Sequence, residues 1–111
     1  MRVLTLEWIE KAEGDYNTAL RESRARKSPN YDAACFHCQQ CAEKYLKALL
    51  QERCVSDFPE IELHRDALTV LDRYAVIFRY PGERAIKSDA QSALKMLREF
   101  RKFARNQLDL D

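Results

Sequence analysis

Three polar residues between positions 40 and 47 have types and spacing that suit recognition of a phosphate. Gln40, Lys44 and Lys47 follow one another at steps of four and three residues, so a helix would present them on one side. Three further side chains could complete the set (Asp15, Arg79 and Tyr80). Amide, ammonium, guanidinium and phenol groups donate the hydrogen bonds that hold a phosphate and a base. These six residues are the candidate site for a nucleotide or a partner.

The same face also has a purely structural interpretation. Gln40 and Glu43 could simply bond neighbouring helices, and Arg79 could pair with Asp15 or Glu43, leaving a solvated surface. The sequence contains no glycine-rich loop that would bring backbone amides to a phosphate, so affinity for a free nucleotide would be modest. Both interpretations stay open.

Cysteines recur at every third position in the same region and raise the question of a metal site. The group is Cys35, Cys38 and Cys41, with His37 among them. Structural zinc sites usually place such ligands on a turn that wraps around the ion, whereas these residues rotate steadily around one helix. Only Cys54 and His64 remain as distant ligands. We therefore expect no metal and no redox role, and predict small thiols packed in a core.

A basic stripe is predicted near the C-terminus. Arg98, Lys102 and Arg105 recur at steps of four and three residues, and residues 83–106 hold seven basic but only three acidic side chains. Such a stripe is usually a solvated face; otherwise it would meet an acidic protein or a phosphate backbone, with binding that weakens as salt is added. Few aromatic residues lie along it to stack bases, which disfavours RNA. A second basic cluster occurs earlier in the chain (Arg21, Arg24, Arg26 and Lys27).

Composition indicates the elements that must position these side chains. The chain has 111 residues, two glycines and three prolines, and 33% of its residues are charged, which favours one all-α domain over residues 1–111. The net charge of +1 gives no strong attraction to nucleic acid or lipid. No stretch approaches eighteen apolar residues and the N-terminus is not typical of a signal peptide, so we expect a cytoplasmic protein that contacts no membrane, with reduced cysteines.

Hydrophobic periodicity predicts four helices. The first should span about 6–22, with Thr5 as N-cap and Glu7 in its first turn. The second should span 31–53, after the break at Ser28-Pro29-Asn30. Asp57 and Pro59 should open a third that continues to Arg79. A capping box is predicted at residues 88–91 for the last helix.

Short connections between these helices make an antiparallel, up-and-down four-helix bundle the expected fold. The second helix should bury one side in the core (Tyr31, Cys35, Cys38, Ala42, Tyr45 and Leu49). On the last helix, Phe100 and Phe103 widen the apolar row beyond what one small core needs. We take that width as support for a homodimer.

The ordered set of motifs resembles the HEPN family of small helical proteins. The resemblance joins the run from Gln39 to Ala48 with three other groups of residues: Trp8, Ala12 and Asp15; Tyr31, Ala33 and Phe36; and Phe78 to Pro81. Compared with the family pattern, the segment between the second helix and the Arg79-Tyr80-Pro81 turn is shortened. His64 therefore most closely fits the helix leading into that turn.

The resemblance implies a helical platform that works with a separately encoded minimal nucleotidyltransferase, in a two-gene module of toxin-antitoxin type. Catalytically active relatives resemble one another in an arginine followed four to six residues later by a histidine. Here both candidate gaps, Arg26 to His37 and Arg53 to His64, are eleven residues. We therefore expect a non-catalytic module without a cofactor. The alternatives are an RNA-cleaving toxin built without that pair and a stand-alone nucleotide sensor.

Overall fold

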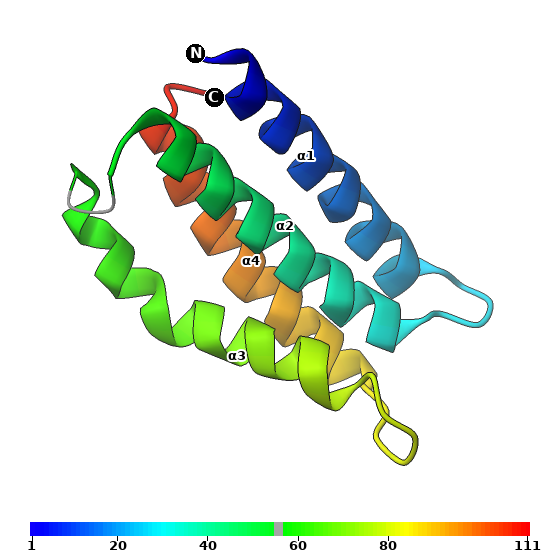
Figure 1. Ribbon diagram of the computed structural model, residues 1–111. Coiled ribbons are helices and arrows are strands. Elements are labelled where there is room, and N and C mark those ends of the chain that lie inside the picture. The colour runs from blue at the N-terminus through cyan, green and yellow to red at the C-terminus, as the bar shows by residue number, and fades with distance from the viewer. Residues whose placement is uncertain (55–56) are drawn as a thin grey trace.

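The chain folds as an antiparallel up-and-down bundle of four α-helices, as the sequence predicts (Figure 1). The computed structural model describes residues 1–54 and 57–111. The helices are α1 (Val3–Arg24), α2 (Tyr31–Glu52), α3 (Arg65–Ile77) and α4 (Lys87–Gln107), and a 3-10 helix, η2 (Pro59–His64), leads into α3. The described residues contain no strand.

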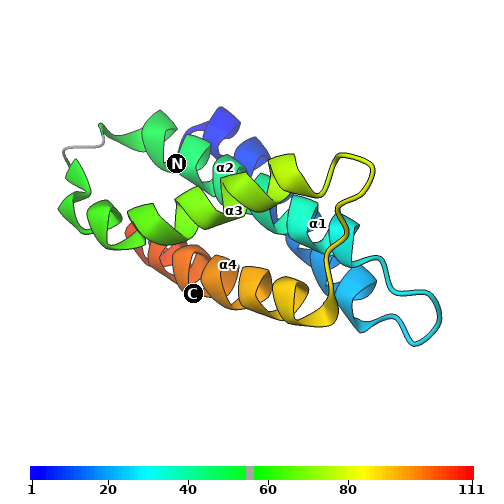
Figure 2. The ribbon, with the colours of Figure 1, turned by 90° about the horizontal axis from the view of Figure 1, so that it is seen from below.

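Helix α2 is the centre of the bundle and packs against α1, α3 and α4. Helices α1, α2 and α4 run alongside one another, whereas α3 is inclined to them (Figures 1 and 2). Both chain ends lie at the same end of the bundle, where Met1 and Gln107 line one shallow groove. Within the described ranges, no helix has the length and apolar character needed to cross a bilayer.

The sequence of α2 explains its central position. Asn30 caps the helix, since its side chain accepts a hydrogen bond of 2.9 Å from the backbone N–H of Ala33. The predicted packing side is confirmed for Cys35, Cys38, Ala42, Tyr45 and Leu49, which are all buried, whereas Tyr31 is half-buried and packs against them. Alanines such as Ala12 and Ala19 on α1 let that helix approach α2 closely.

The start of α1 differs from the prediction. The helix begins at Val3, so Thr5 is not its N-cap and Glu7 lies beyond the first turn. Thr5 is fully buried instead and donates a hydrogen bond of 2.7 Å to Glu52 at the end of α2. Because the hydroxyl bonds to an acceptor on the adjacent helix, it does not cap the N-terminus of its own helix.

Helix α4 begins one residue before the predicted capping box. Asp89 accepts a hydrogen bond of 2.9 Å from the backbone N–H of Ile86, which makes Ile86 the N-cap residue and places Ser88 within the first turn. The predicted capping box, which begins at Ser88 and ends at Gln91, is therefore wrong, and Asp89 is the residue that caps the helix. The carboxylate stands at the third position of the helix, from which it accepts a hydrogen bond from the N-cap residue, three positions earlier in the sequence.

The predicted third helix is divided. Residues from Pro59 form the 3-10 helix, α3 follows at Arg65, and it ends at Ile77, before Arg79. The N-cap of the 3-10 helix is Phe58 and not Asp57, whose carboxylate accepts a hydrogen bond of 3.0 Å from the backbone N–H of Cys54. His64 is thus the last residue of η2, directly before α3.

The apolar surface of α4 is covered within the chain. Phe100 is fully buried, and the His64 ring lies 5.5 Å from the Phe100 ring and 4.7 Å from the Phe103 ring, centre to centre. These aromatic rings widen the row in order to receive η2 and α3. The width of the row therefore no longer argues for a homodimer.

Candidate functional site

A buried carboxylate on α1 organises the polar centre between α1 and α2. Asp15 lies on the same side of α1 as Ala12 and Ala19, and only 8% of its surface is exposed. It accepts hydrogen bonds of 2.7 Å from Nδ1 of His37 and 2.5 Å from Nζ of Lys44. The two helices are thus joined by a charge-assisted contact that also fixes both basic side chains.

His37 is the functional candidate that the sequence prediction missed, because it was considered only as a metal ligand and as the histidine of a pair with Arg26. It precedes Gln40 by three residues and Lys44 by seven, a spacing that already places it on their side of α2. The bond to Asp15 places a proton on Nδ1, so a neutral imidazole in this position has its lone pair on Nε2. The side chain is 29% exposed, so an oriented imidazole faces partly outward.

The rest of the α2 polar face (Gln40, Glu43, Lys44 and Lys47) is held by contacts within the chain. Lys47 lies 3.6 Å from Glu43, and its Nζ is 4.8 Å from the centre of the Trp8 ring on α1. Gln40 donates to Gln39 at 2.8 Å in its own helix. The residue that bonds α3 is Gln39, through Asp72, so the expected cross-helix role of Gln40 is wrong.

Arg79 and Tyr80 lie elsewhere, at the end of α3 beside the start of α2. Arg79 shares a shallow groove with Asp32 and Phe36, and Tyr80 is 62% exposed. Asp32 and Lys44 are twelve residues apart on one helix, which is about 18 Å along its axis. The six predicted residues therefore form two groups. In the described ranges, the partners of the Asp15 carboxylate are His37 and Lys44, so the alternative pairing with Arg79 does not occur.

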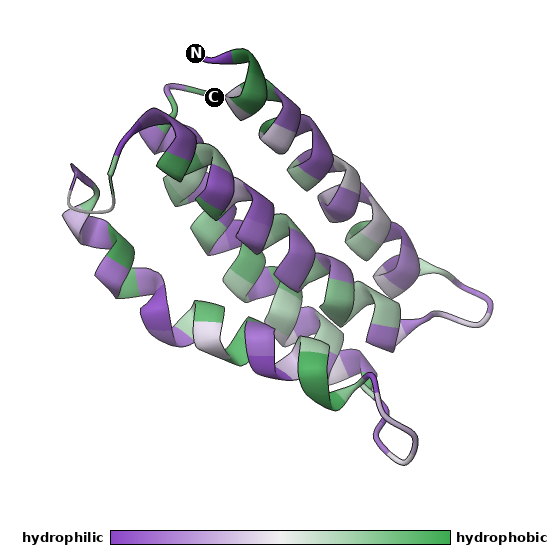
Figure 3. Cartoon of the chain, viewed as in Figure 1, coloured by the Kyte–Doolittle hydropathy of each residue, from purple (hydrophilic) through white to green (hydrophobic). Residues whose placement is uncertain are grey.

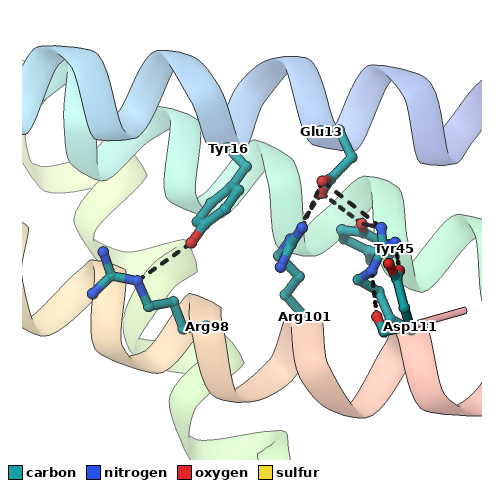
Figure 4. A network of polar contacts seen from close by, with 7 residues as sticks. Glu13, Tyr16, Tyr45, Arg98, Arg101 and Asp111 are labelled. Carbon is teal, nitrogen blue, oxygen red and sulfur yellow. Dashed lines mark hydrogen bonds and ion pairs between the residues drawn. The ribbon is translucent and has the colours of Figure 1, made fainter.

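The predicted basic stripe on α4 is not continuous. Lys102 is exposed, but Arg98 donates a hydrogen bond of 3.3 Å to the phenol of Tyr16, and Arg105 donates to Tyr45 at 3.0 Å (Figure 4). Arg105 also pairs with Asp111, and its side chain is only 16% exposed. The prediction of a continuous stripe is wrong because α1 and the C-terminus supply acceptors for these side chains. Sequence spacing on α4 cannot reveal those acceptors.

Glu13 is the centre of this second polar network, which joins α1, α2 and α4. Its carboxylate accepts two hydrogen bonds from Arg101, of 2.6 and 2.8 Å, and one of 2.6 Å from Tyr45. The bonds from Arg101 lower the pKa of Glu13, burial opposes this, and the bond from Tyr45 lowers the pKa further. Burial and the bond to Glu13 raise the pKa of Tyr45. The network binds three helices together.

Three of the cysteines are packing residues, as predicted. Cys35, Cys38 and Cys41 are fully buried, and burial raises the pKa of the first two to about 12 and that of Cys41 as well. Cys54 is exposed. In the part of the chain that the structure describes, no three His, Cys, Asp or Glu side chains gather in a way that could hold a metal ion.

The comparison with protein families gives one match. The family described as HEPN domain matches residues 5–61, which is just over half of the 111 residues. The matched segment contains nearly all of α1, the whole of α2 and the Asp15 contact between them, but neither the Arg79-Tyr80 turn nor α4. No curated protein and no solved structure matches the chain.

Proposed function

The chain belongs to the HEPN domain family, and on that premise we propose that it is a non-catalytic interaction module. In this proposal it forms a homodimer in the cytoplasm and acts with a minimal nucleotidyltransferase, in a module of toxin-antitoxin type. The α2 polar face would help to hold the nucleotide, and no cofactor is required.

An exposed apolar surface at the start of α1 is the observation that carries the proposal. Val3, Leu4 and Leu6 expose 73%, 47% and 50% of their surface, and Met1 beside them exposes 54%. Figure 3 shows the beginning of α1 coloured as hydrophobic. Exposed apolar groups that are adjacent on one turn are typical of association sites. This apolar turn replaces α4 as the candidate contact surface.

The placement of His64 supports a role without catalysis. His64 packs against Phe100 and Phe103, and burial lowers its pKa, so it serves as a core residue. Helix α4 carries no histidine. The motif of active relatives, an arginine with a histidine four to six residues later, is therefore absent from the chain.

Association is tested by light scattering and by co-expression with a nucleotidyltransferase encoded beside this chain. We expect the isolated chain to have twice its 13.1 kDa mass and to capture the nucleotidyltransferase from the same cell. Leu6→Glu should weaken one or both contacts, because it places a charge on the apolar turn. Leu63→Glu is the matched control, since Leu63 is 82% exposed on η2. A monomer that captures nothing would refute the proposal.

The contribution of the α2 polar face to nucleotide binding has its own optical probe. Because the ammonium of Lys47 lies over the Trp8 ring, a phosphate that attracts Lys47 should change Trp8 fluorescence. ATP or GTP should also raise the melting temperature if only the folded chain binds it. Lys47→Gln should remove the optical response, whereas Lys95→Gln on exposed α4 should keep it. An unchanged emission in wild type argues against this contribution.

One observation favours a second candidate, RNA cleavage. The Asp15-His37 contact orients an imidazole as general base catalysis requires, and Lys44 lies beside it. If this candidate holds, His37→Ala should abolish cleavage, while His64→Gln, which changes a packing histidine, should retain it. Purified wild type that leaves diverse RNAs intact eliminates this second candidate and agrees with the non-catalytic module.

A further inference from the structure

We propose that a basic groove between the end of α1 and the start of α4 binds a compact polyphosphate anion. The groove has a volume of about 480 Å³ and is lined by four cationic side chains and by neutral polar groups that can donate hydrogen bonds. The residues that carry the argument are Arg24, Arg26, Lys87, Arg98, Tyr31 and Gln91. This site is separate from the α2 polar face and from the apolar turn of α1.

The fold assembles the groove from two basic clusters that are far apart in the sequence. Arg24 lies in the last turn of α1 and Arg26 follows in the loop, whereas Lys87 is the first residue of α4. The end of α1 and the start of α4 lie at the same end of the bundle (Figure 1). Antiparallel packing thus brings together charges that no local pattern connects.

Within the described residues, the cations of the groove form no ion pair with the chain's own carboxylates. Its lining contains no aspartate or glutamate. Among the described residues, Arg24, Arg26 and Lys87 are exposed and take part in no ion pair, since the ion pairs that occur there involve other residues. The partner of Arg98 is the neutral phenol of Tyr16. Cations that converge on a concave surface attract anions more strongly than the same charges spread over a flat one.

The pattern of charge along α4 favours a compact anion over an extended nucleic acid. Beyond Arg98, the guanidinium of Arg101 is paired with Glu13 and that of Arg105 with Asp111. A nucleic acid strand would need a continuing track of available cations, whereas outside the groove α4 offers the two separate exposed lysines Lys95 and Lys102. A triphosphate or tetraphosphate group matches this clustered positive charge, and the guanidinium groups of the arginines can each bind it through two hydrogen bonds. Tyr31 and Gln91 supply neutral hydrogen-bond donors at the same place.

The test is calorimetric titration with inorganic tripolyphosphate at low salt. Wild type should bind it, and added salt should weaken the binding. We expect Arg24→Gln combined with Lys87→Gln to lower the affinity by about tenfold or more, because each removes a charge-assisted contact. The control, Lys95→Gln combined with Lys102→Gln, removes the same charge from exposed positions of α4 outside the groove. It should keep the affinity within about twofold.

Two further titrations identify the source of the polyphosphate. If ATP binds with the same affinity as tripolyphosphate, the phosphates alone are recognised. If ATP binds more tightly, the nucleoside adds contacts. Both results support the proposal. A single-stranded RNA that binds more tightly than tripolyphosphate, and that loses affinity equally in both double variants, overturns it. So does the absence of any heat from tripolyphosphate at millimolar concentration.

Folding of the variants does not confuse the result, since the substituted side chains are exposed. Arg26→Gln, in the loop after α1, gives a second variant outside any helix. The proposal is also independent of the interaction module. Leu6→Glu should leave tripolyphosphate binding unchanged, and the double groove variant should leave the mass of the isolated chain unchanged.

Discussion

Replacing Glu13 by glutamine should destabilise the bundle substantially, although the two side chains have nearly the same size. The carboxylate accepts three hydrogen bonds, two from Arg101 and one from Tyr45, and the three residues come from three different helices. Glutamine has one oxygen acceptor and no charge. The substitution therefore leaves the guanidinium of Arg101 without its counter-ion.

The magnitude follows from the exposure of the pair. Breaking a fully buried ion pair costs about 3–5 kcal/mol, whereas an exposed pair contributes about 1 kcal/mol or less. Here the side chains of Glu13 and Arg101 are 31% and 26% exposed, so the contact lies between these limits. We expect Glu13→Gln to lower the free energy of unfolding by about 2 kcal/mol. For a chain of this length that is a fall of about 8 °C in melting temperature.

The pH dependence of the loss provides a second test of its cause. The bonds from Arg101 hold the pKa of Glu13 below its ordinary value of 4.5, so the folded state binds fewer protons than the unfolded state in that range. The stabilisation is fully present above pH 4.5 and is lost as the pH falls through the lowered pKa. The difference between wild type and Glu13→Gln should therefore shrink at acidic pH.

Urea unfolding monitored by circular dichroism at pH 7, 5, 4 and 3 measures both effects. Glu10→Gln is the matched control, because Glu10 is an exposed glutamate on the same helix. It should change the free energy of unfolding by no more than about 0.5 kcal/mol. If Glu13→Gln behaved like this control, or if its deficit stayed constant down to pH 3, the network would not stabilise the bundle as argued.

Three other predictions test other parts of the structure. With a thiol reagent, native protein should label rapidly at Cys54 alone among its four cysteines, and the remaining three should label only after denaturation, because they are fully buried; rapid labelling of more than one thiol per chain contradicts this packing. His64 has a lowered pKa because of burial, so the unfolded state binds its proton more readily and stability should fall as the pH drops below 6.5. His64→Leu should remove that part of the pH dependence in urea unfolding at pH 7 and 5, and an equal pH dependence in both proteins would contradict the packing role. Asp15→Asn should cost about 1–3 kcal/mol, because a buried acceptor shared by His37 and Lys44 loses its charge; a melting temperature equal to that of wild type would refute the role of this contact.

The sequence was sufficient to predict four helices in antiparallel order and the packing side of α2, because these depend on local spacing, but the predicted start of the first helix and the undivided third helix were wrong. The break at Ser28-Pro29-Asn30 and the turn at Tyr80-Pro81-Gly82 lie where predicted, between helices. The burial of Cys35, Cys38 and Leu49 follows from one helical period. These features can be predicted without knowing which helices pack against one another.

The contacts between helices could not be predicted in the same way. Spacing shows that Arg98, Lys102 and Arg105 share a region of α4, but not that Glu13, 88 residues before Arg101, lies opposite that helix. Thr5 has the residue type of an N-cap, yet its acceptor is Glu52 at the far end of α2. Spacing could have placed His37 beside Gln40 and Lys44, but its hydrogen bond to Asp15 on α1 could not be predicted.

The two candidate anion sites differ in what a ligand must displace. A phosphate at Lys44 would compete with Asp15 for the ammonium and would leave a buried carboxylate with less compensation. Ligand binding on the α2 polar face is therefore coupled to loosening of the contact between α1 and α2, which lowers its affinity. Arg24, Arg26 and Lys87 have no such internal partner among the described residues, so an anion in the basic groove gains their charge without that cost. On this reasoning, tripolyphosphate should occupy the groove at lower concentration than the α2 face, and Trp8 fluorescence should respond only after the calorimetric signal of the groove has saturated.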